Sequence, residues 1–210
     1  FVWDGRHAKP TKLQKPRAKS SREEALEGSV PPRAIPGSYQ VRLQVGSDTF
    51  TESFTFVLDP RLPVSQADLE TQLAMKVAIR DRLSEVNGAL NRIQQVRDQV
   101  DAWTRRSDDK DLGEAARAFK EALKAVEGEL INLTSDKPRP DPNRLKEKFE
   151  ALSGMIDEAD AAPTQGAHEV YDLLVGRLRE QQQRLAEALD QPLRSVNERI
   201  TALGLAPVGV

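Results

Sequence analysis

The sequence contains no cysteine, only two histidines and two methionines, and aromatic residues make up 5% of its 210 positions. The absence of cysteine excludes disulfide bonds and every site that needs a thiolate, and it leaves the redox compartment open. No run of about 18 apolar residues occurs, so no membrane span is predicted. The formal net charge is −2, so overall charge gives the chain no attraction to nucleic acid or to an anionic membrane.

Motifs that carry well-known catalytic chemistry are also missing. There is no GxSxG, P-loop or GxGxxG sequence. His168 has one candidate ligand at helical spacing, Asp172, and two ligands are fewer than a zinc site needs. The acidic cluster Asp108–Asp111 lacks the later ligands of a calcium loop, and helix capping explains it better. We therefore predict no catalytic, cofactor-binding or metal-binding residue, and we expect no enzymatic activity from this chain alone.

The stretch Ser38–Pro60 is the clearest β-structure in the sequence. Apolar and polar residues alternate from Tyr39 to Val45, turn residues follow at Gly46–Asp48, and a second alternation ends at Leu58. An isolated hairpin is only marginally stable in water. We therefore expect its apolar face to be buried, either against strands outside this sequence or against the long helix that follows. The residues of that face are Tyr39, Val41, Leu43, Val45, Phe54, Phe56 and Leu58.

The region before the hairpin has no usable periodicity. Residues 1–4 resemble the end of a strand, which we expect to lie beside the hairpin. Residues 7–37 form a long basic loop with several prolines and a basic run from Lys9 to Arg22. This run is either an anion-binding patch or a solvated loop. Aromatic residues do not interleave with its charges as in a single-strand binding platform, so we favour the solvated loop and expect no nucleic-acid partner.

Beyond Pro60 the spacing of apolar residues changes to three and four, which predicts amphipathic helices over about residues 65–106, 112–133, 142–160 and 164–203. Short connections favour antiparallel neighbours. The predicted fold is therefore mainly α with a small β part. A partial Ig-like β-sandwich at 1–62, made of the hairpin and an N-terminal strand, precedes an antiparallel four-helix bundle at 63–210.

Local signals mark the ends of these helices. Ser65 and Asp68 have the spacing of a capping box. Asp141 before Pro142 is the favoured start of the third helix, and Thr164 is a plausible cap of the fourth. Pro192 is expected to kink or restart the last helix.

Two sets of short motifs resemble known families. The sequences FVWDGR at 1–6 and PGSYQVRL at 36–43 are similar to the Ig-like domain of flagellar hook-capping proteins and of bacterial secretion-tail domains. A wider resemblance is to the C-terminal region of large bacterial sortilin-like, BNR-repeat β-propeller proteins, many of them labelled glycosyl hydrolases. The motifs that carry it, in this order, are DPR at 59–61, SQADL at 65–69, IRD at 79–81 and DAAPT at 160–164.

The second resemblance implies an export signal, a long propeller, an Ig-like module and a terminal helical segment. The hydrolase label belongs to the propeller, so it implies no catalytic residue here. Because the chain begins at Phe1 without methionine, we also expect a fragment of a longer protein. The leading expectation is a non-catalytic structural or interaction module at the C-terminal end of a larger exported β-propeller protein, in the periplasm or at the cell surface.

Upstream β-propeller or Ig-like strands, or another protein chain, are its expected partners. Two alternatives stay open. The chain is either a subunit or interaction module of a multi-protein assembly, which uses an exposed strand edge or its helices, or an accessory part of a glycoside hydrolase. The role of the basic stretch Lys9–Arg22 is open as well.

Overall fold

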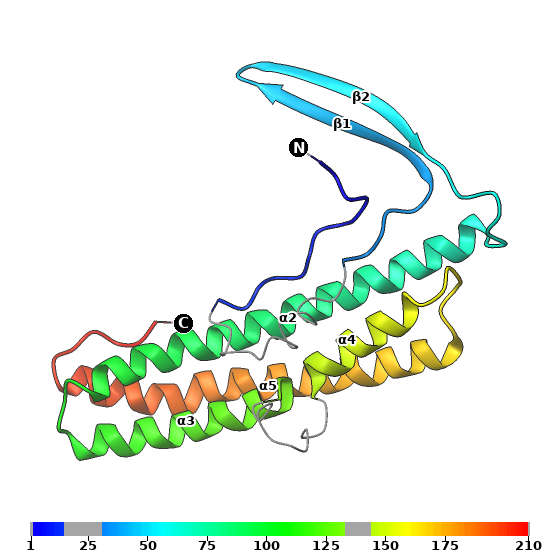
Figure 1. Cartoon of the computed structure of the whole chain (residues 1–210). Helices are drawn as coiled ribbons and strands as arrows, with labels where there is room; N and C mark the ends of the chain where they lie inside the picture. The colour runs from blue at the N-terminus through cyan, green and yellow to red at the C-terminus, as the bar shows by residue number, and fades with distance from the viewer. Residues whose placement is uncertain (1, 15–30, 133–143, 210) are drawn as a thin grey trace, which may run out of the picture.

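The computed structural model describes residues 2–14, 31–132 and 144–209, which form a hairpin and a bundle of helices (Figure 1). The predicted mainly helical fold with a small β part is confirmed. No helix in the described ranges is long and apolar enough to cross a membrane. The elements are β1 (Gly37–Val45), β2 (Asp48–Phe56), α2 (Gln66–Thr104), α3 (Lys110–Leu130), α4 (Leu145–Ile156) and α5 (Gln165–Ala202).

Side-chain caps fix the starts of three helices. The Ser65 hydroxyl accepts a hydrogen bond from the Asp68 amide at 3.1 Å, and the Ser65 amide donates to the Asp68 carboxylate at 3.3 Å, so the predicted capping box is confirmed. The Ala167 amide donates to Thr164 Oγ1 at 3.2 Å, as predicted. Asp109 caps α3 by accepting from the Leu112 amide at 2.7 Å. The expected cap at 141 and the proline after it lie outside the described residues.

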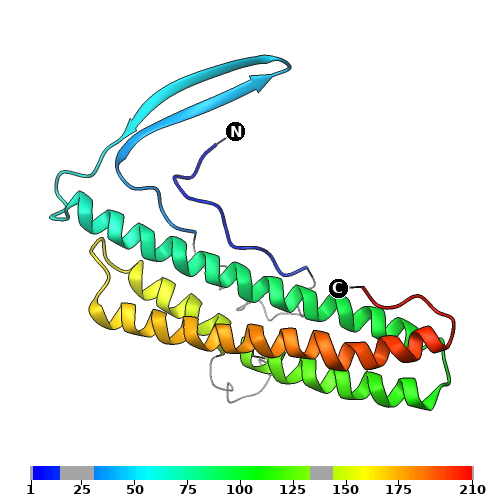
Figure 2. The ribbon, with the colours of Figure 1, turned by 180° about the vertical axis from the view of Figure 1, so that it is seen from behind.

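In the rod that α2, α3, α4 and α5 form, α3 and α4 run in the same direction, so the expectation of antiparallel neighbours does not hold for this pair. Arg97 on the C-terminal half of α2 pairs with Glu127 of α3 at 2.6 Å. Lys76 on the N-terminal half of α2 donates instead to the Ser153 carbonyl of α4 at 3.0 Å. Both views show α3 and α4 end to end in one direction, with α2 and α5 running the opposite way beside them (Figures 1 and 2).

Helix length explains this arrangement. The helices α2 and α5 have 39 and 38 residues, which makes each about 58 Å long at 1.5 Å per residue. The helices α3 and α4 have only 21 and 12 residues. Neither alone can cover the apolar stripe of α2, but the two in tandem reach about 50 Å.

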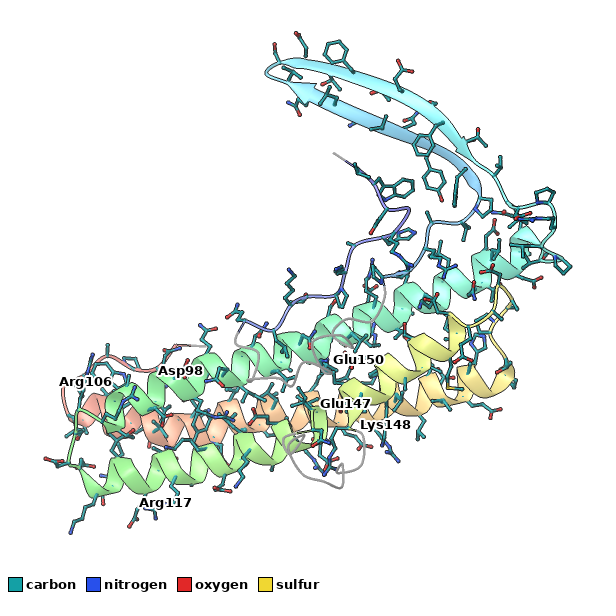
Figure 3. The ribbon with its side chains drawn as sticks, in the orientation of Figure 1. Asp98, Arg106, Arg117, Glu147, Lys148 and Glu150 are labelled. Atoms are coloured by element: carbon teal, nitrogen blue, oxygen red, sulfur yellow. The ribbon has the colours of Figure 1, made fainter. Side chains whose placement is uncertain are left out.

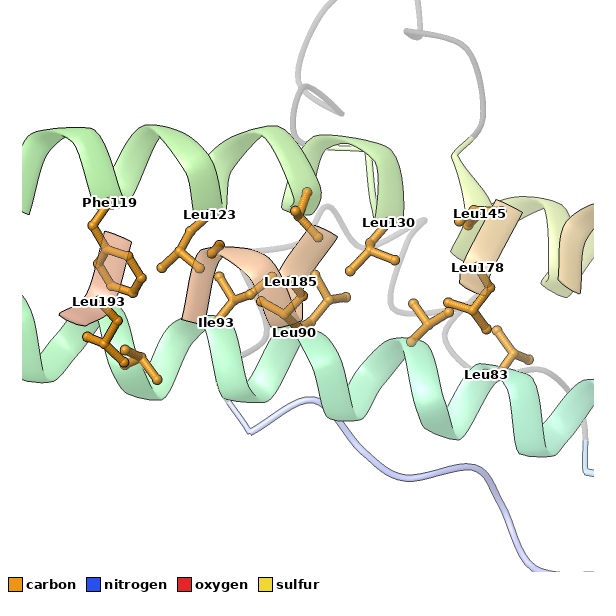
Figure 4. Packing of buried hydrophobic residues seen from close by; sticks show 14 of the residues in the cluster. Leu83, Leu90, Ile93, Phe119, Leu123, Leu130, Leu145, Leu178, Leu185 and Leu193 are labelled. Atoms are coloured by element: carbon orange, nitrogen blue, oxygen red, sulfur yellow. The ribbon is translucent and has the colours of Figure 1, made fainter. Parts of the chain in front are cut away.

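The hydrophobic core runs along the whole rod. The predicted stripe of α3 is confirmed from Leu112 to Leu130, and Phe119 lies at its centre with no exposed surface (Figure 4). On α2 the predicted stripe is confirmed at Leu69 and again from Leu83 to Val100. Between these, Met75 and Ile79 are buried whereas Leu73 and Val77 are only half-buried, because the repeat of three and four runs through Met75 and Ile79. The other buried members of the cluster come from α4, α5 and the C-terminal tail.

The expected restart of the last helix at Pro192 is wrong, because α5 continues through it as one helix. Proline removes one intrahelical hydrogen bond and crowds the preceding turn. Here Ala188 and Leu193, on either side of the proline, are both buried against the other helices. Packing of this face holds the helix together across the missing bond.

The segments before the hairpin are extended but form no strand in the described ranges. The expected strand at 1–4 is replaced by an isolated bridge between Arg6 and Arg33. Two backbone hydrogen bonds flank it, from the His7 amide to the Pro32 carbonyl at 2.8 Å and from the Ala34 amide to the Gly5 carbonyl at 2.7 Å. The pairing is too short to build a third strand. Within the described ranges, neither strand of the hairpin packs against a helix.

Candidate interaction site on the hairpin

The hairpin is a two-stranded ribbon with one apolar and one polar side. Its register pairs Tyr39 with Phe54 and Leu43 with Phe50. Gly46 has a φ of +61°, and Ser47 after it has no positive φ, which is the pattern of a type II′ hairpin turn. Since side chains alternate along a strand, the polar side consists of Ser38, Gln40, Arg42, Gln44, Thr49, Thr51, Ser53 and Thr55.

We call the opposite side the apolar face; its members are Gly37, Tyr39, Val41, Leu43, Val45, Asp48, Phe50, Glu52, Phe54 and Phe56. Most of it is open. Leu43 and Phe50 are 60% and 57% exposed, and the other valines and phenylalanines of the face are exposed as well. The expectation that α2 buries this face is therefore wrong. The apolar stripe of α2 is already covered by the other helices, and the ribbon extends away from the rod (Figure 1).

The base of the apolar face has a small aromatic cluster. Trp3 lies over Tyr39 and Phe54, with ring centroids 5.5 and 6.0 Å apart, and the rings of Tyr39 and Phe54 stack at 5.7 Å. The indole Nε1 donates to the Arg6 carbonyl at 2.9 Å, and the Tyr39 hydroxyl donates to the Ile35 carbonyl at 2.6 Å. Trp3 therefore covers one end of the face and leaves the end near the turn uncovered.

The apolar face carries two charged residues, Asp48 and Glu52, and both are exposed. Asp48 lies opposite Val45 beside the turn, and Glu52 lies opposite Val41 in the middle of the strand. Within the described part of the chain, no hydrogen bond or ion pair to the Glu52 carboxylate occurs. A surface that covers this face must therefore leave Glu52 in water or supply a donor for it, because an unpaired buried carboxylate is costly.

A pocket of about 290 Å³ lies at the base of the hairpin, between residues 32–36, the end of β2, the start of α2 and the end of α4. Its wall is mainly apolar, and its polar side chains include Lys76, Asp157 and Asp160. Lys76 is buried, with 3% of its surface exposed. Its ammonium lies 3.3 Å from Asp157 and donates to the Ser153 carbonyl at 3.0 Å.

These contacts make Lys76 a structural group rather than a free cation. Burial lowers the pKa of Lys76, because a charged ammonium loses hydration in the protein interior. The nearby Asp157 carboxylate counteracts this shift, and Arg6 and Arg33 add a small further lowering of the same pKa. Three carboxylates line the pocket, those of Asp59, Asp157 and Asp160, and two of them are paired: Asp157 with Lys76 at 3.3 Å and Asp59 with Arg61 at 2.6 Å.

The residues considered as ligands or catalysts from the sequence are not brought together. His168 and Asp172 are both exposed on α5. Asp109 is the helix cap described above, and Asp111 pairs with Arg199 at 3.1 Å. In the described ranges no three His, Cys, Asp or Glu side chains are grouped as a metal site would need. Most of the basic stretch 9–22 lies outside the described residues.

Sequence reasoning missed Lys76, although a signal existed. Lys76 follows buried Met75 directly and precedes Ile79 by three residues, which places it at the edge of the apolar stripe. Sequence reasoning also missed the openness of the hairpin face, because alternation predicts which side is apolar but not what covers it.

Comparison with known proteins adds no relative. No family model matches the chain, and searches of curated proteins and of solved structures return no match.

Proposed function

We propose that this chain is a non-catalytic interaction module whose hairpin forms part of a β-sandwich, completed by strands of a larger exported β-propeller protein. The observation that carries this proposal is the ribbon with one wholly polar side and one open apolar face. The motif resemblance described above is the reason for naming a propeller protein as the source of the missing strands and for placing the protein outside the cytoplasm.

Physical chemistry supports a missing sheet. Two strands alone are marginally stable in water, and further strands or a packed layer are normally needed. Six valine, leucine and phenylalanine side chains of the face are exposed, and full burial of each such side chain is worth about 1.5–3 kcal/mol. In a β-sandwich the inner faces of two sheets pack about 10 Å apart while their outer faces stay in solvent. The polar side of this hairpin suits that outer position.

A lipid surface fits the hairpin poorly. A two-stranded ribbon leaves the outer backbone groups of both strands unpaired, and such open edges are not tolerated in the hydrocarbon core of a membrane. Those same edges favour a second candidate, strand addition by another protein chain in an assembly. This alternative rests on the absence of a third strand beside either edge in the described ranges.

The proposal is tested by comparing the chain alone with the longer product of its own gene, if the reading frame continues upstream of Phe1. Amide hydrogen exchange of β1 and β2 is measured in both proteins. We expect fast exchange in the chain alone and at least tenfold slower exchange in the longer product, since covered strands open less often. Equal exchange, or an upstream sequence without strands, would contradict completion in cis.

A matched pair of variants shows which side of the ribbon is covered. Leu43→Glu on the apolar face should abolish the additional protection in the longer product, because a carboxylate would be buried between two sheets. Gln40→Glu on the polar side should leave it intact. Carbohydrate turnover by the purified chain would contradict the non-catalytic part of the proposal.

A further inference from the structure

The outward side of α2 has an unusual composition. Ser84, Asn87 and Asn91 follow one another at steps of three and four, and Gln95 and Gln99 continue the row. Residues at these steps share one face of a helix. Outer faces elsewhere on the rod present charged side chains, such as Arg117 of α3 (Figure 3). Uncharged amides and hydroxyls carry both donors and acceptors, so this row is suited to binding a polypeptide backbone.

Residues 11–14 occupy part of the row in an extended conformation. The Thr11 amide donates to Ser84 Oγ at 3.1 Å, and Asn87 Nδ2 donates to the Thr11 carbonyl at 2.7 Å. Asn91 makes two bonds at once.

Asn91 Nδ2 donates to the Lys12 carbonyl at 2.9 Å, and Asn91 Oδ1 accepts from the Gln14 amide at 2.8 Å. All four bonds use main-chain atoms of the segment. Leu13 is the one side chain of the segment that packs against the hydrophobic core, where it is partly buried.

The C-terminal tail is held by the same chemistry. Asn197 donates to the Val208 carbonyl at 3.2 Å and accepts from the Val208 amide at 2.7 Å. Gln99 donates to the Gly209 carbonyl at 3.0 Å and accepts from the Gly209 amide at 3.2 Å. Residues 11–14 run beside α2 (Figure 1), whereas the tail bridges α2 and α5, since Gln99 and Asn197 come from those two helices. The tail is the more firmly anchored of the two, because Val208 is fully within the core and Leu13 is not.

We propose that Ser84, Asn87 and Asn91 form a seat for an extended peptide of a partner protein, which residues 11–14 occupy when no partner is bound. The seat binds the main chain, so it does not distinguish the chain's own segment from another. The peptide it accepts has an aliphatic side chain at the place of Leu13. It has no proline at the places of Thr11 and Gln14, because both positions must donate an N–H.

Residues 11–14 and the partner peptide compete for the same hydrogen-bonding groups of Ser84, Asn87 and Asn91. The chain's own segment has the advantage of a tethered ligand, whose effective concentration is high. Residues 11–14 are bound weakly, because only four hydrogen bonds and one half-buried side chain hold them. Peripheral segments of this kind detach locally far more often than the core unfolds. The seat lies on α2, so this inference does not depend on what covers the hairpin.

The test uses the full chain and a fluorescently labelled peptide with the sequence of residues 8–14, AKPTKLQ. In the double variant Thr11→Pro with Gln14→Pro, the chain's own segment loses both N–H donors and vacates the seat. We expect the peptide to bind this variant at least tenfold more tightly than it binds the wild-type chain. Adding Asn91→Ala should weaken binding again by about tenfold, since two hydrogen bonds are lost.

Peptide controls test the stated specificity. A peptide with Leu13→Ala should bind more weakly by tenfold or more, whereas a peptide with Lys12→Ala should bind as tightly as the original. Circular dichroism and thermal unfolding confirm that each chain variant keeps the helical rod. No binding to the double variant, or binding that Asn91→Ala leaves unchanged, would overturn the proposal.

Discussion

Leu43 and Phe50 lie directly opposite each other across the hairpin, and more than half of each side chain is exposed to solvent. Opposed aliphatic and aromatic side chains stabilise a sheet when a further layer covers them. When no layer covers them, the same pair forms the middle of an exposed apolar surface, which we expect to promote self-association of the isolated chain.

The first prediction concerns that surface. Replacing Leu43 and Phe50 together by threonine keeps strand-forming residues but removes most of the apolar area near the turn. We expect lower binding of a hydrophobic dye and less self-association at high concentration, measured by fluorescence and by light scattering. The helical unfolding midpoint should not change, because neither strand packs against a helix.

A control on the other side of the ribbon makes this prediction specific. Gln40 and Ser53 likewise lie directly opposite each other, on the polar side. Replacing both by threonine should change neither dye binding nor self-association. If the two double variants behave alike, the apolar face is not the source of the adhesion.

The second prediction concerns Trp3. Its ring lies over Tyr39 and Phe54, and in the described ranges it makes no ring contact with a helix residue. Trp3→Ala should therefore raise dye binding and weaken the near-ultraviolet circular dichroism of the aromatic cluster, while thermal unfolding of the rod stays the same. Trp3→Phe should preserve most of the wild-type signal, because a smaller ring still covers the cluster. A fall in the unfolding temperature with Trp3→Ala would show that the tryptophan contacts the core.

The third prediction compares two phenylalanines. Phe119 is fully buried in the core of the rod, and Phe50 is 57% exposed on the hairpin. Phe119→Ala should lower the free energy of unfolding by about 3–5 kcal/mol, because it removes a core side chain and leaves a cavity. Phe50→Ala should change it by less than about 0.5 kcal/mol. Urea unfolding of both variants measures the contrast, and similar losses would contradict the described burial.

The fourth prediction follows from the buried ammonium of Lys76. Its pKa is lowered in the folded chain, so between this lowered value and the ordinary lysine pKa of about 10.4 the unfolded chain binds more protons. Stability contributed at this site therefore rises as the pH increases through that interval. Below the lowered pKa, the cost of burying the charge is present in full.

Lys76→Met should remove this rise in stability at alkaline pH. We expect the difference in unfolding free energy between wild type and variant to shift in favour of the wild type as the pH increases toward the ordinary lysine pKa, because the buried ammonium loses its proton in the folded chain first. Lys124→Met is the matched control, because its side chain is 66% exposed and its pairing with Glu121 is loose, at 3.8 Å. A pH dependence equal to that of the control would refute the assignment.

The sequence predicted the helical part of this fold well for physical reasons. A core stripe repeats at three and four residues, so the buried residues of α3 could be identified from spacing alone. Caps are local as well, and Ser65 and Thr164 needed no knowledge of the tertiary structure. The restart expected at Pro192 failed, because burial on both sides of a proline outweighs its local cost.

The order in which the helices pack, and what covers the apolar face of the hairpin, were harder to predict. The tandem placement of α3 and α4 depends on matching their lengths to α2, and short-connection reasoning ignores that constraint. The row from Ser84 to Asn91 carries no apolar periodicity, so a search for core residues or catalytic motifs passes over it. The open face between Leu43 and Phe50 shows the same limit, because alternation cannot say what lies opposite a strand.

The two long helices give the rod a further mechanical property. Since α2 runs without interruption for 39 residues, the hairpin at its start and the turn after Thr104 are held about 58 Å apart. Two groups attached at these two ends would be held at that separation. A deletion of one helical turn from α2 alone would not simply shorten it, because α3, α4 and α5 would then meet the wrong residues along its length.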